Sequence, residues 1–388
     1  MKLTIASVEA LALSAPFERA YGGIENVPQW LLTPASSHRV LPRLGQYSTL
    51  VRIRTSDGLE GIGEAYGLPE PRVTATIIGT MLAPMLIGRD AGASEALWDT
   101  MFGAQSGAGR LGGFYLEAIS GVDLALWDLR GKALGEPVHR LLGGPVREAV
   151  PVYASPIPFL PTAEESAARA TSFVDSGFRA VKLKLGRGEA TDLAHAVAVV
   201  DALAGRAALH VDLNCAYDVQ TAIRLGHALR ELGVRWFEEP LPTDDVAGLA
   251  EVRAAVRIPV VTGESEFTRY GYRDFLSARA VDVVMPNLAR AGGITETRRI
   301  AALCSAFHVD VSPHGVGGAV ALGAALNFAA ATGNVPILEY NRLPNPLRDR
   351  LPLATPELVD GALRVPTGPG LGVELDWDLV REFEVFRA

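Results

Sequence analysis

Two lysines separated by one residue, Lys182 and Lys184, are the first candidates for chemistry in this chain of 388 residues. They alternate with apolar Val181, Leu183 and Leu185. This period of two predicts a β-strand on which both lysines point to the same face. Two neighbouring ammonium groups repel each other, so each should lose its proton more readily than a solvated lysine and one could act as a base. The alternative is a solvated basic strand at a sheet edge.

Three acidic residues follow at regular spacing. The interval from Asp212 to Glu238 equals that from Glu238 to Glu264, as expected for equivalent places in consecutive strand and helix units. Three carboxylates at one rim repel one another unless a cation lies between them, and oxygen ligands suit a hard divalent ion such as Mg²⁺. Each acid could instead pair with a nearby arginine or cap the following helix, but the shared spacing favours a metal site.

The elements that must position these residues begin near residue 150, where short apolar runs alternate with helical segments. The predicted strands are 150–155, 180–186, 208–214, 234–240, 259–265, 281–287, 309–315 and 337–341. Helical periodicity occurs at 163–176, 191–204, 219–232 and 294–307. Eight such runs predict an α/β barrel, in which the residues that close each strand form the active site. A doubly wound sheet is the alternative, but no Gly-x-Gly-x-x-Gly follows a first strand.

The residues before the barrel predict an α+β unit. Strands are expected over 2–16 and 47–67, with a hairpin turn at Asp57-Gly58, and helices over 72–87, 94–102 and 114–133. The segment 18–44, rich in Gly, Pro and Ser, is expected to be a flexible loop or a lid over the site. We expect a capping domain at 1–135, a barrel at 136–354, and a carboxyl-terminal segment at 355–388 that packs back on the cap.

Polar residues close seven of the predicted strands, and together they resemble a known family. They are Lys182 and Lys184, Asp212 and Asn214, Glu238 and Glu239, Glu264, Asn287, His314, and Glu339. The Lys-x-Lys, Asp-x-Asn, Glu-Glu-Pro, Gly-Glu and His motifs, in this order, resemble those of the enolase superfamily, mandelate racemase subgroup. The resemblance covers nearly the whole chain and implies a (β/α)7β modified TIM barrel with an α+β capping domain.

The resemblance also implies roles for individual residues. Asp212, Glu238 and Glu264 correspond to Mg²⁺ ligands, and Lys184 corresponds to a base with Lys182 beside it. His314 corresponds to an acid or base on the opposite face, and Glu339 to an electrophilic partner of the substrate carboxylate. The family's common step is removal of a proton α to a carboxylate, which requires positive charge or hydrogen bonds to stabilise the enediolate.

One residue departs from the family pattern. The subgroup usually has an aspartate at the end of the sixth strand, paired with the histidine, whereas this chain has Asn287. A neutral amide can orient an imidazole without stabilising its charged form, so His314 should be a weaker base and a better acid. We therefore expect Lys184 to remove the α proton and His314 to assist a one-way elimination or ring opening.

The leading functional hypothesis is a Mg²⁺-dependent dehydratase of a sugar acid. The alternatives are a cycloisomerase of a sugar-acid lactone, a racemase or epimerase of an α-hydroxy acid, and, in another class, a noncatalytic sugar-acid binding protein. A dipeptide epimerase is disfavoured because no lysine follows the sixth strand. The substrate should be a small carboxylate whose specificity is set by loops near 21–30, where Tyr21 is a candidate contact, and near 66–71.

Composition excludes several other classes. The net charge of -8 argues against a nucleic-acid or acidic-membrane surface. Cys215 and Cys304 form no disulfide framework or metal motif, which indicates a reducing, cytoplasmic compartment. Residues 1–9 show no basic region followed by an apolar one, and no apolar run is long enough to span a bilayer, so we expect a soluble, cytosolic protein. The family resemblance implies a homo-oligomer.

Overall fold

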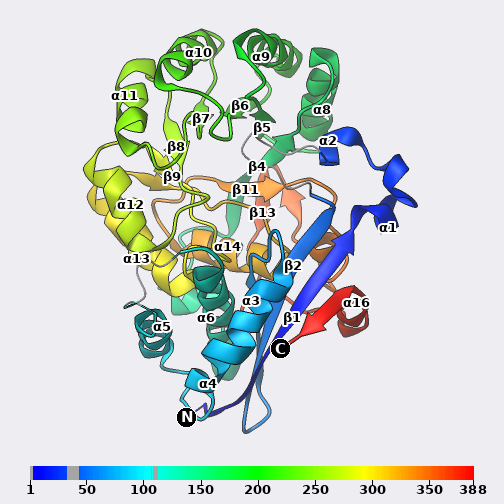
Figure 1. Cartoon of the computed structure of the whole chain (residues 1–388), viewed down its shortest axis with the longest axis vertical. Coiled ribbons are helices and arrows are strands. Elements are labelled where there is room, and N and C mark those ends of the chain that lie inside the picture. Colours follow the sequence, from blue (N-terminus) through cyan, green and yellow to red (C-terminus); the bar gives the residue numbers. More distant parts are fainter. Residues whose placement is uncertain (1–2, 33–42, 106, 108–111) are drawn as a thin grey trace.

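The computed structural model describes residues 3–32, 43–105, 107 and 112–388. A closed parallel sheet forms a barrel, and a four-stranded antiparallel sheet belongs to a smaller cap (Figure 1). The architecture is therefore the predicted (β/α)7β barrel with an α+β cap. No helix in the described ranges is long and apolar enough to cross a membrane.

Residues 149–341, all of which the structure describes, supply the barrel. Its strands are β4 (Ala149–Ile157), β5 (Ala180–Lys184), β6 (Ala208–Asp212), β7 (Trp236–Glu238), β8 (Val260–Thr262), β9 (Val283–Val284), β10 (Asp310–Val311) and β11 (Leu338–Asn341). The helices between them are α8 (Ala163–Asp175), α9 (Glu189–Leu203), α10 (Val219–Glu231), α11 (Val246–Val256), α12 (Thr268–Ser277), α13 (Gly293–Ala306) and α14 (Ala319–Ala331). Each predicted strand run overlaps one of these strands, and each predicted helical segment overlaps a helix whose ends lie within two residues of those predicted.

The strands follow one another around the barrel in chain order. Strands β4 to β10 pair with their sequence neighbours, and β11 returns to pair with β4. Between β10 and β11, the backbone N–H of Glu339 donates to the carbonyl of Pro313 at 3.3 Å. All eight strands are parallel, so their carboxyl ends meet at one rim.

The alternation of side chains in β5 decides what faces the interior. Val181 and Leu183 are fully buried in the main apolar core, which lies between the strands and the surrounding helices. Lys182 and Lys184 point to the other face, into the barrel, where both contact Asp212. The prediction that both lysines share a face is therefore confirmed, and the alternative of an exposed edge strand is wrong because β4 and β6 flank β5 on both sides.

The cap is built on the sheet order β14-β1-β2-β3. Its strands are β1 (Ile5–Pro16), β2 (Gly45–Thr55), β3 (Glu60–Ala65) and β14 (Glu384–Arg387). Its helices are α3 (Pro71–Ile77), α4 (Ala83–Leu86), α5 (Ser94–Gly103) and α6 (Gly113–Leu134), and a π-helical turn η2 (Ile78–Leu82) joins α3 to α4. The predicted hairpin turns at Asp57-Gly58, as expected, whereas the single helix predicted over 72–87 is interrupted by η2.

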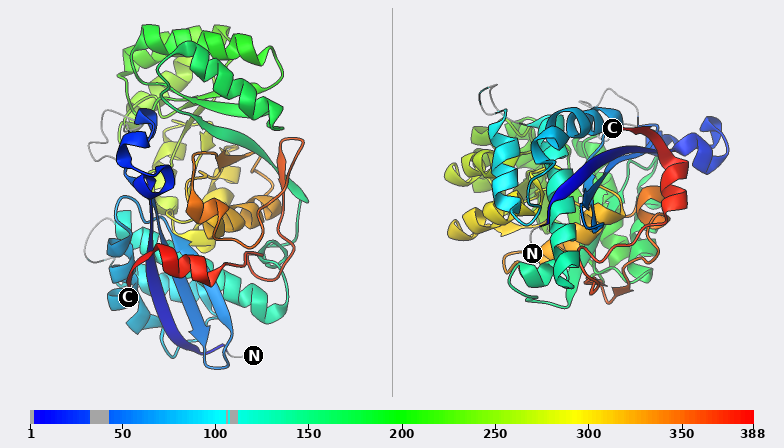
Figure 2. Two further views of the ribbon diagram at one scale, coloured as in Figure 1. Left: turned by 90° about the vertical axis from the view of Figure 1, so that its right-hand side faces the viewer. Right: turned by 90° about the horizontal axis from the view of Figure 1, so that it is seen from below.

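Helix α6 joins the cap to the barrel (Figure 2). The indole N–H of Trp127 donates to Thr295 Oγ1 of α13 at 2.9 Å, and that of Trp98, on α5, donates to the carbonyl of Gly292 at 2.8 Å. Asp123 Oδ2 accepts the backbone N–H of Thr295 at 2.9 Å. The cap therefore contacts the amino-terminal end of α13.

The segment expected to be a loop or lid is partly helical. Residues 17–32 form α1 (Phe17–Tyr21), a 3-10 turn η1 (Ile24–Asn26) and α2 (Gln29–Leu32). Phe17, Val27 and Leu31 make a small buried cluster, against which Tyr21 and Leu343 pack. Residues 33–42, including His38, lie outside the described ranges.

The last part of the chain contacts both units. After α15 (Pro346–Asp349), strands β12 (Leu358–Val359) and β13 (Ala362–Arg364) form a hairpin that pairs with β4, and α16 (Trp377–Phe383) leads into β14. Residue 370 approaches α6 closely: a Cβ at Gly131 would lie 2.5 Å from the Cα of Gly370, so only glycine fits at this helix position.

Candidate active site

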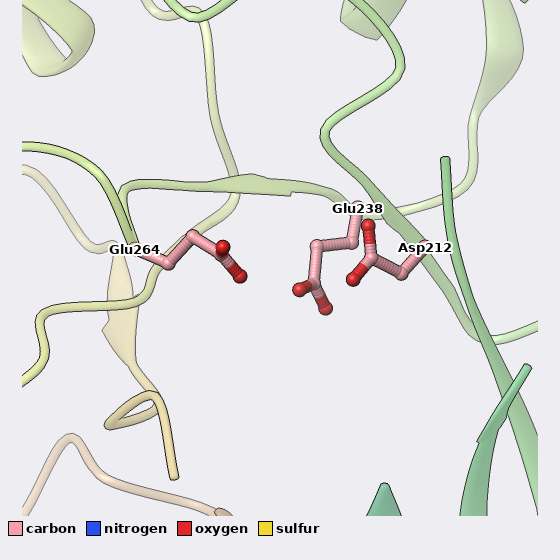
Figure 3. Close-up of side chains that lie close together, drawn as sticks. All are labelled: Asp212, Glu238 and Glu264. Carbon is pink, nitrogen blue, oxygen red and sulfur yellow. The ribbon is translucent and has the colours of Figure 1, made fainter. Parts of the chain in front are cut away.

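The three acidic residues predicted as metal ligands meet at the carboxyl ends of neighbouring strands. Asp212 ends β6, Glu238 ends β7, and Glu264 follows β8. Their carboxylates point toward one another (Figure 3). One oxygen from each lies within 4.8 Å of the others, and all three side chains are buried. Equal spacing in the sequence thus corresponds to equivalent positions on one rim.

Lys182 is fully buried among carboxylates. Its Nζ lies 2.7 Å from Glu238 Oε1, 3.0 Å from Glu339 Oε1 and 3.4 Å from Asp212 Oδ2. Burial favours the neutral amine, but the charges of Glu238 and Glu339 outweigh it and raise the pKa of Lys182 well above its usual range. The expectation that Lys182 loses its proton easily is therefore wrong. Lys182 supplies a fixed positive charge.

Lys184 is the more accessible lysine, with 15% of its side chain exposed. Its Nζ donates to Asp212 Oδ2 and, at 2.8 Å, to Asn214 Oδ1. Asn214 has a left-handed backbone, with φ of 43°, and its N–H donates to Asp212 Oδ1 at 2.9 Å. The other end of its amide, Nδ2, is buried and has no hydrogen-bond partner among the described residues. This leaves a donor that a substrate oxygen could use.

The two lysines and the crowding of the acids move the pKa values of the carboxylates apart. Burial would raise the pKa of Asp212, but Lys184 and Lys182 lower it overall. Burial and the charge of Asp212 raise the pKa of Glu238 well above its usual range. These opposite shifts arise because the carboxylates compete for too few positive charges.

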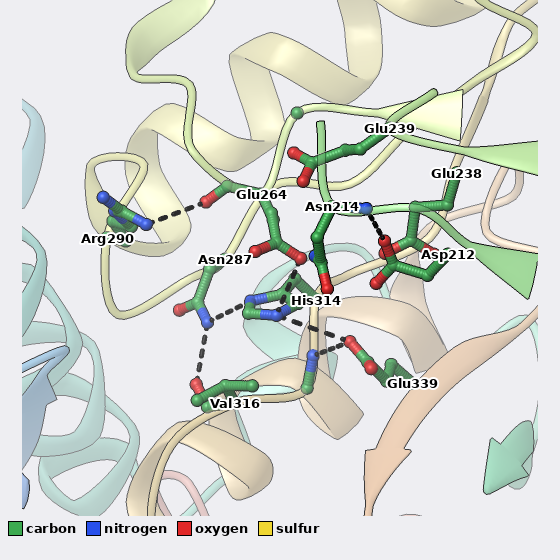
Figure 4. Close-up of polar contacts among 12 residues, drawn as sticks. Asp212, Asn214, Glu238, Glu239, Glu264, Asn287, Arg290, His314, Val316 and Glu339 are labelled. Atoms are coloured by element: carbon green, nitrogen blue, oxygen red, sulfur yellow. Dashed lines mark hydrogen bonds and ion pairs between the residues drawn. The ribbon is translucent and has the colours of Figure 1, made fainter. Parts of the chain in front are cut away.

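His314 lies in the loop after β10 and is held by Asn287, as Figure 4 shows. Asn287 Nδ2 lies 3.0 Å from His314 Nδ1 and also donates to the carbonyl of Val316 at 2.8 Å. The backbone N–H of Ala289 donates to Asn287 Oδ1 at 2.9 Å, which fixes the orientation of the amide. Because Nδ2 can only donate, Nδ1 must accept, so the neutral imidazole carries its proton on Nε2.

The Nε2 atom of His314 faces the acidic site. It lies 3.3 Å from Glu264 Oε2 and 3.7 Å from Glu339 Oε2. Burial lowers the pKa of His314 below its ordinary value, although Glu264 and Glu339 oppose this shift. Lys184 lies on β5, and His314 follows β10. Around the barrel, β4 and β11 lie between these two strands on one side, and β6 to β9 lie between them on the other. An acid and a base can therefore face a substrate from two directions.

Glu339, in β11, is an anion in this arrangement. Its Oε2 accepts the backbone N–H of Gly315 at 2.8 Å. Burial would raise its pKa, but Lys182, His314 and a hydrogen bond from the Ser155 side chain lower the pKa of Glu339 to about 2. The contacts thus favour the ionised form of Glu339, whereas an electrophilic partner that donates a hydrogen bond to the substrate carboxylate would need a protonated one.

Sequence analysis missed several residues around these groups. Ser155, at the end of the first barrel strand, contacts Glu339, and Trp236 Nε1 donates to Glu238 Oε2 at 3.1 Å. His210 stacks on Trp236 at 4.7 Å between ring centroids, and burial lowers the pKa of His210 to about 3. Trp236 and His210 each precede an acidic ligand candidate by two residues, so the strand period could have placed them on the same face.

Tyr21 is not brought to the acidic groups by any described contact. Its side chain packs instead against the small cluster of Phe17, Val27 and Leu31, against which Leu343 also packs. Leu343 follows β11, the strand that carries Glu339. A role of Tyr21 in substrate binding stays a prediction.

The residues present fit a divalent metal ion. Four buried carboxylates, those of Asp212, Glu238, Glu264 and Glu339, face only two ammonium groups, Lys182 and Lys184. Two negative charges are thus uncompensated when all the carboxylates are ionised. Oxygen donors from three adjacent strands within 4.8 Å match the ligand preference of Mg²⁺.

Comparison with known proteins identifies the family. Residues 165–379 match the family model described as enolase C-terminal domain-like, and residues 39–143 match the N-terminal domain of mandelate racemase and muconate lactonizing enzyme. The chain belongs to the mandelate racemase and muconate lactonizing enzyme group of the enolase superfamily.

Individual relatives span nearly the same length. D-galactarolactone cycloisomerase of Agrobacterium fabrum is 36% identical over 347 residues, which cover 87% of this chain and 91% of the relative. Arabinonate dehydratase of Saccharolobus solfataricus is 32% identical over 339 residues, covering 86% and 89%. The crystal structure of a racemase from Streptomyces coelicolor with bound magnesium superposes with a TM-score of 0.87 at 28% identity, covering 98% of this chain and all of that one.

Proposed function

We propose that this protein is a Mg²⁺-dependent dehydratase of a sugar acid, which removes the α proton and then eliminates the β-hydroxyl. The observation that carries the proposal is the opposed pair of Lys184 and His314 around a buried carboxylate triad. Relatives named as arabinonate, L-rhamnonate and D-xylonate dehydratases support the same chemistry.

Asp212, Glu238 and Glu264 would hold the metal ion. When bound, Mg²⁺ would act as a Lewis acid on the substrate carboxylate and acidify the α proton. Lys182, kept charged by Glu238 and Glu339, would stabilise the negative charge that develops on the enediolate oxygens.

Lys184 would remove the α proton. It is the lysine with side-chain exposure, and Asn214 orients its Nζ from the neighbouring strand. Asn214 Nδ2 would donate to a carboxylate or hydroxyl oxygen of the substrate. Lys182 is a poor candidate for the base because three carboxylates hold its proton.

His314 would complete the elimination. Its Nε2 carries the proton in the neutral ring because Asn287 occupies Nδ1. As the C–O bond breaks, that proton can be given to the departing β-hydroxyl, which leaves as water, and the ring then regains a proton from solvent. The neutral ring has no lone pair on Nε2 with which to remove a proton from the opposite face, so racemisation is disfavoured.

A second candidate is cycloisomerisation of a sugar-acid lactone. The relative with 36% identity is named D-galactarolactone cycloisomerase. Opening a lactone by β-elimination needs the same α-proton removal, but its leaving group is a carboxylate and no water is released. The substrate mass therefore stays unchanged in this reaction and falls by one water in dehydration.

The test is a screen of aldonic and aldaric acids and their lactones with and without Mg²⁺. Product mass and deuterium uptake at the α carbon in D₂O are measured for each. A Mg²⁺-dependent loss of water from an acid supports the dehydratase, and turnover of a lactone at unchanged mass supports the cycloisomerase. If no compound exchanges its α proton, both enzyme proposals fail and the noncatalytic binding protein becomes the better hypothesis.

A further inference from the structure

The loop that carries His314 is held residue by residue. Residues 312–318, which we call the His314 loop, connect β10 to α14. The N–H of Gly315 donates to Glu339, and the carbonyl of Val316 accepts from Asn287. The next carbonyl, that of Gly317, accepts from Asn345 Nδ2 at 2.9 Å. Three successive residues after His314 thus have partners in the barrel.

The fourth partner comes from the cap. Glu64, in β3, is buried, with 2% of its surface exposed. Its Oε1 accepts the N–H of Gly318 at 2.5 Å, and its Oε2 accepts the N–H of Ala321 at 2.9 Å. Gly318 and Ala321 belong to the amino-terminal end of α14, where backbone N–H groups lack partners within the helix. A carboxylate there is also favoured by the helix dipole.

The local sequence is suited to this contact. A Cβ at Gly318 would lie 2.9 Å from Glu64 Oε1, closer than carbon and oxygen normally approach, so the residue at the start of α14 has no room for a side chain while Glu64 caps the helix. Helices usually receive such a cap from a residue in their own chain segment. Here the capping carboxylate lies more than 250 positions earlier, on a strand of the other unit.

We infer that Glu64 is a positioning residue for His314, through which the cap fixes the end of the His314 loop and so the place of the imidazole. The inference rests on the proposed role of His314 as the acid in the second step. Without the carboxylate, Gly318 would no longer be anchored, and the loop would be held only by its barrel contacts. His314 would then be misplaced relative to the leaving group, whereas Lys184, on β5, would keep its position.

The two proposed steps can be measured separately, which makes the inference testable. Deuterium uptake at the α carbon of recovered substrate reports proton removal by Lys184, and product formation reports the step that needs His314. In Glu64→Gln, an amide N–H₂ faces a backbone N–H, so one capping bond is lost with little change in shape. Product formation should fall about 10- to 100-fold through kcat, while α-proton exchange stays within about threefold of the parent, since small displacements of a catalytic group carry costs of this order.

Asp128→Asn is the matched control. Asp128 is a fully buried cap carboxylate that accepts the N–H groups of Ile62 and Leu371, both at 2.8 Å, and has no bond to the His314 loop. It should lower stability without changing the ratio of exchange to product formation. If Glu64→Gln lowers exchange and product formation together, or if Asp128→Asn shifts the ratio equally, the inference is overturned.

A readout independent of activity separates this inference from the proposed function. In protein labelled with ¹³C at histidine Cε1, the NMR signal of His314 can be assigned by its loss in His314→Asn. Glu64→Gln should shift or broaden that signal, and Asp128→Asn should leave it in place. An unchanged His314 signal in Glu64→Gln would refute the positioning role, and failure of the parent to exchange any α proton would refute the proposed reaction.

Discussion

Asn287 Nδ2 lies 3.0 Å from His314 Nδ1, and the amide cannot turn over without loss of two backbone hydrogen bonds, to Val316 and Ala289. An amide fixed in this way determines which imidazole nitrogen carries the proton. An aspartate in its place would accept a hydrogen bond from a protonated Nδ1, which leaves the lone pair of Nε2 free to act as a base.

The direction of the reaction is the first prediction. The parent enzyme should exchange the α proton of only one α epimer in D₂O, because only Lys184 is a competent base. Asn287→Asp should add exchange of the opposite epimer, since His314 could then accept a proton on Nε2. Proton NMR of both epimers in D₂O measures this. Comparable exchange of the two epimers by the parent would contradict the assignment.

Loss of the base is the second prediction. Lys184→Ala should reduce α-proton exchange and product formation together, by about 10²- to 10⁴-fold, the usual contribution of a general base. Lys132→Ala is the control. Lys132 lies on α6 of the cap, outside the active site, and its ion-pair partner is Asp128. This variant should exchange the α proton and form product at the rates of the parent. Parent-like turnover by Lys184→Ala would show that the base lies elsewhere.

Metal binding should be visible as stability. Mg²⁺ that binds only the native state at about 100 times its Kd adds about 2.7 kcal/mol to the free energy of unfolding. The midpoint of thermal unfolding should therefore be higher with Mg²⁺ than with EDTA, both in the parent and in Asp128→Asn. The difference should shrink strongly in Glu264→Gln, which removes one ligand but leaves the contacts of both lysines intact. An equal Mg²⁺ effect in Glu264→Gln would place the metal elsewhere.

A buried acid between cap and barrel should make stability depend on pH. Burial raises the pKa of Asp123 to about 7. Its native state therefore retains a proton that the unfolded chain releases near pH 4, so this group makes the free energy of unfolding fall as pH rises from about 4 to about 7, by at most about 1.4 kcal/mol per pH unit. Above that range its contribution is constant.

Asp123→Asn tests this directly. Urea unfolding of parent and variant across pH 5 to 8 gives their difference in free energy, in which the contributions of other groups cancel. The parent should lose stability relative to the variant as pH rises, and the difference should level off above pH 7. A difference that is flat or slopes the other way over this range would contradict the raised pKa.

The residues at the rim of the barrel could be predicted from the sequence because their positions depend on short sequence patterns. The strand period places Lys182 and Lys184 on one face, and parallel strands bring Asp212, Glu238 and Glu264 to one edge. The charge state of Lys182 could not be predicted in this way, because it depends on three acids from three other strands whose distances only the fold sets. The adjacent lysine suggested an amine that is easily deprotonated, and the structure has the reverse.

Contacts between the cap and the barrel also could not be predicted from the sequence. Glu64 lies in a strand whose pattern indicates only a hairpin, and nothing in it points to the start of a helix more than 250 positions later. The interruption of the helix at Ile78 and the short helices over 17–32 were missed for a related reason. Whether such segments are helical depends on tertiary packing, because intrinsic helix propensity alone is a weak guide.

The pairing of β14 with β1 has a consequence for how the chain folds. The cap sheet takes strands from residues 5–65 and from 384–387, so the barrel is in effect an insertion within the cap. During synthesis the barrel strands leave the ribosome before the last cap strand exists. Long-range pairings of this kind are slow to form, so we expect a nascent chain to hold an assembled barrel whose cap has an open sheet edge until residues 384–387 emerge.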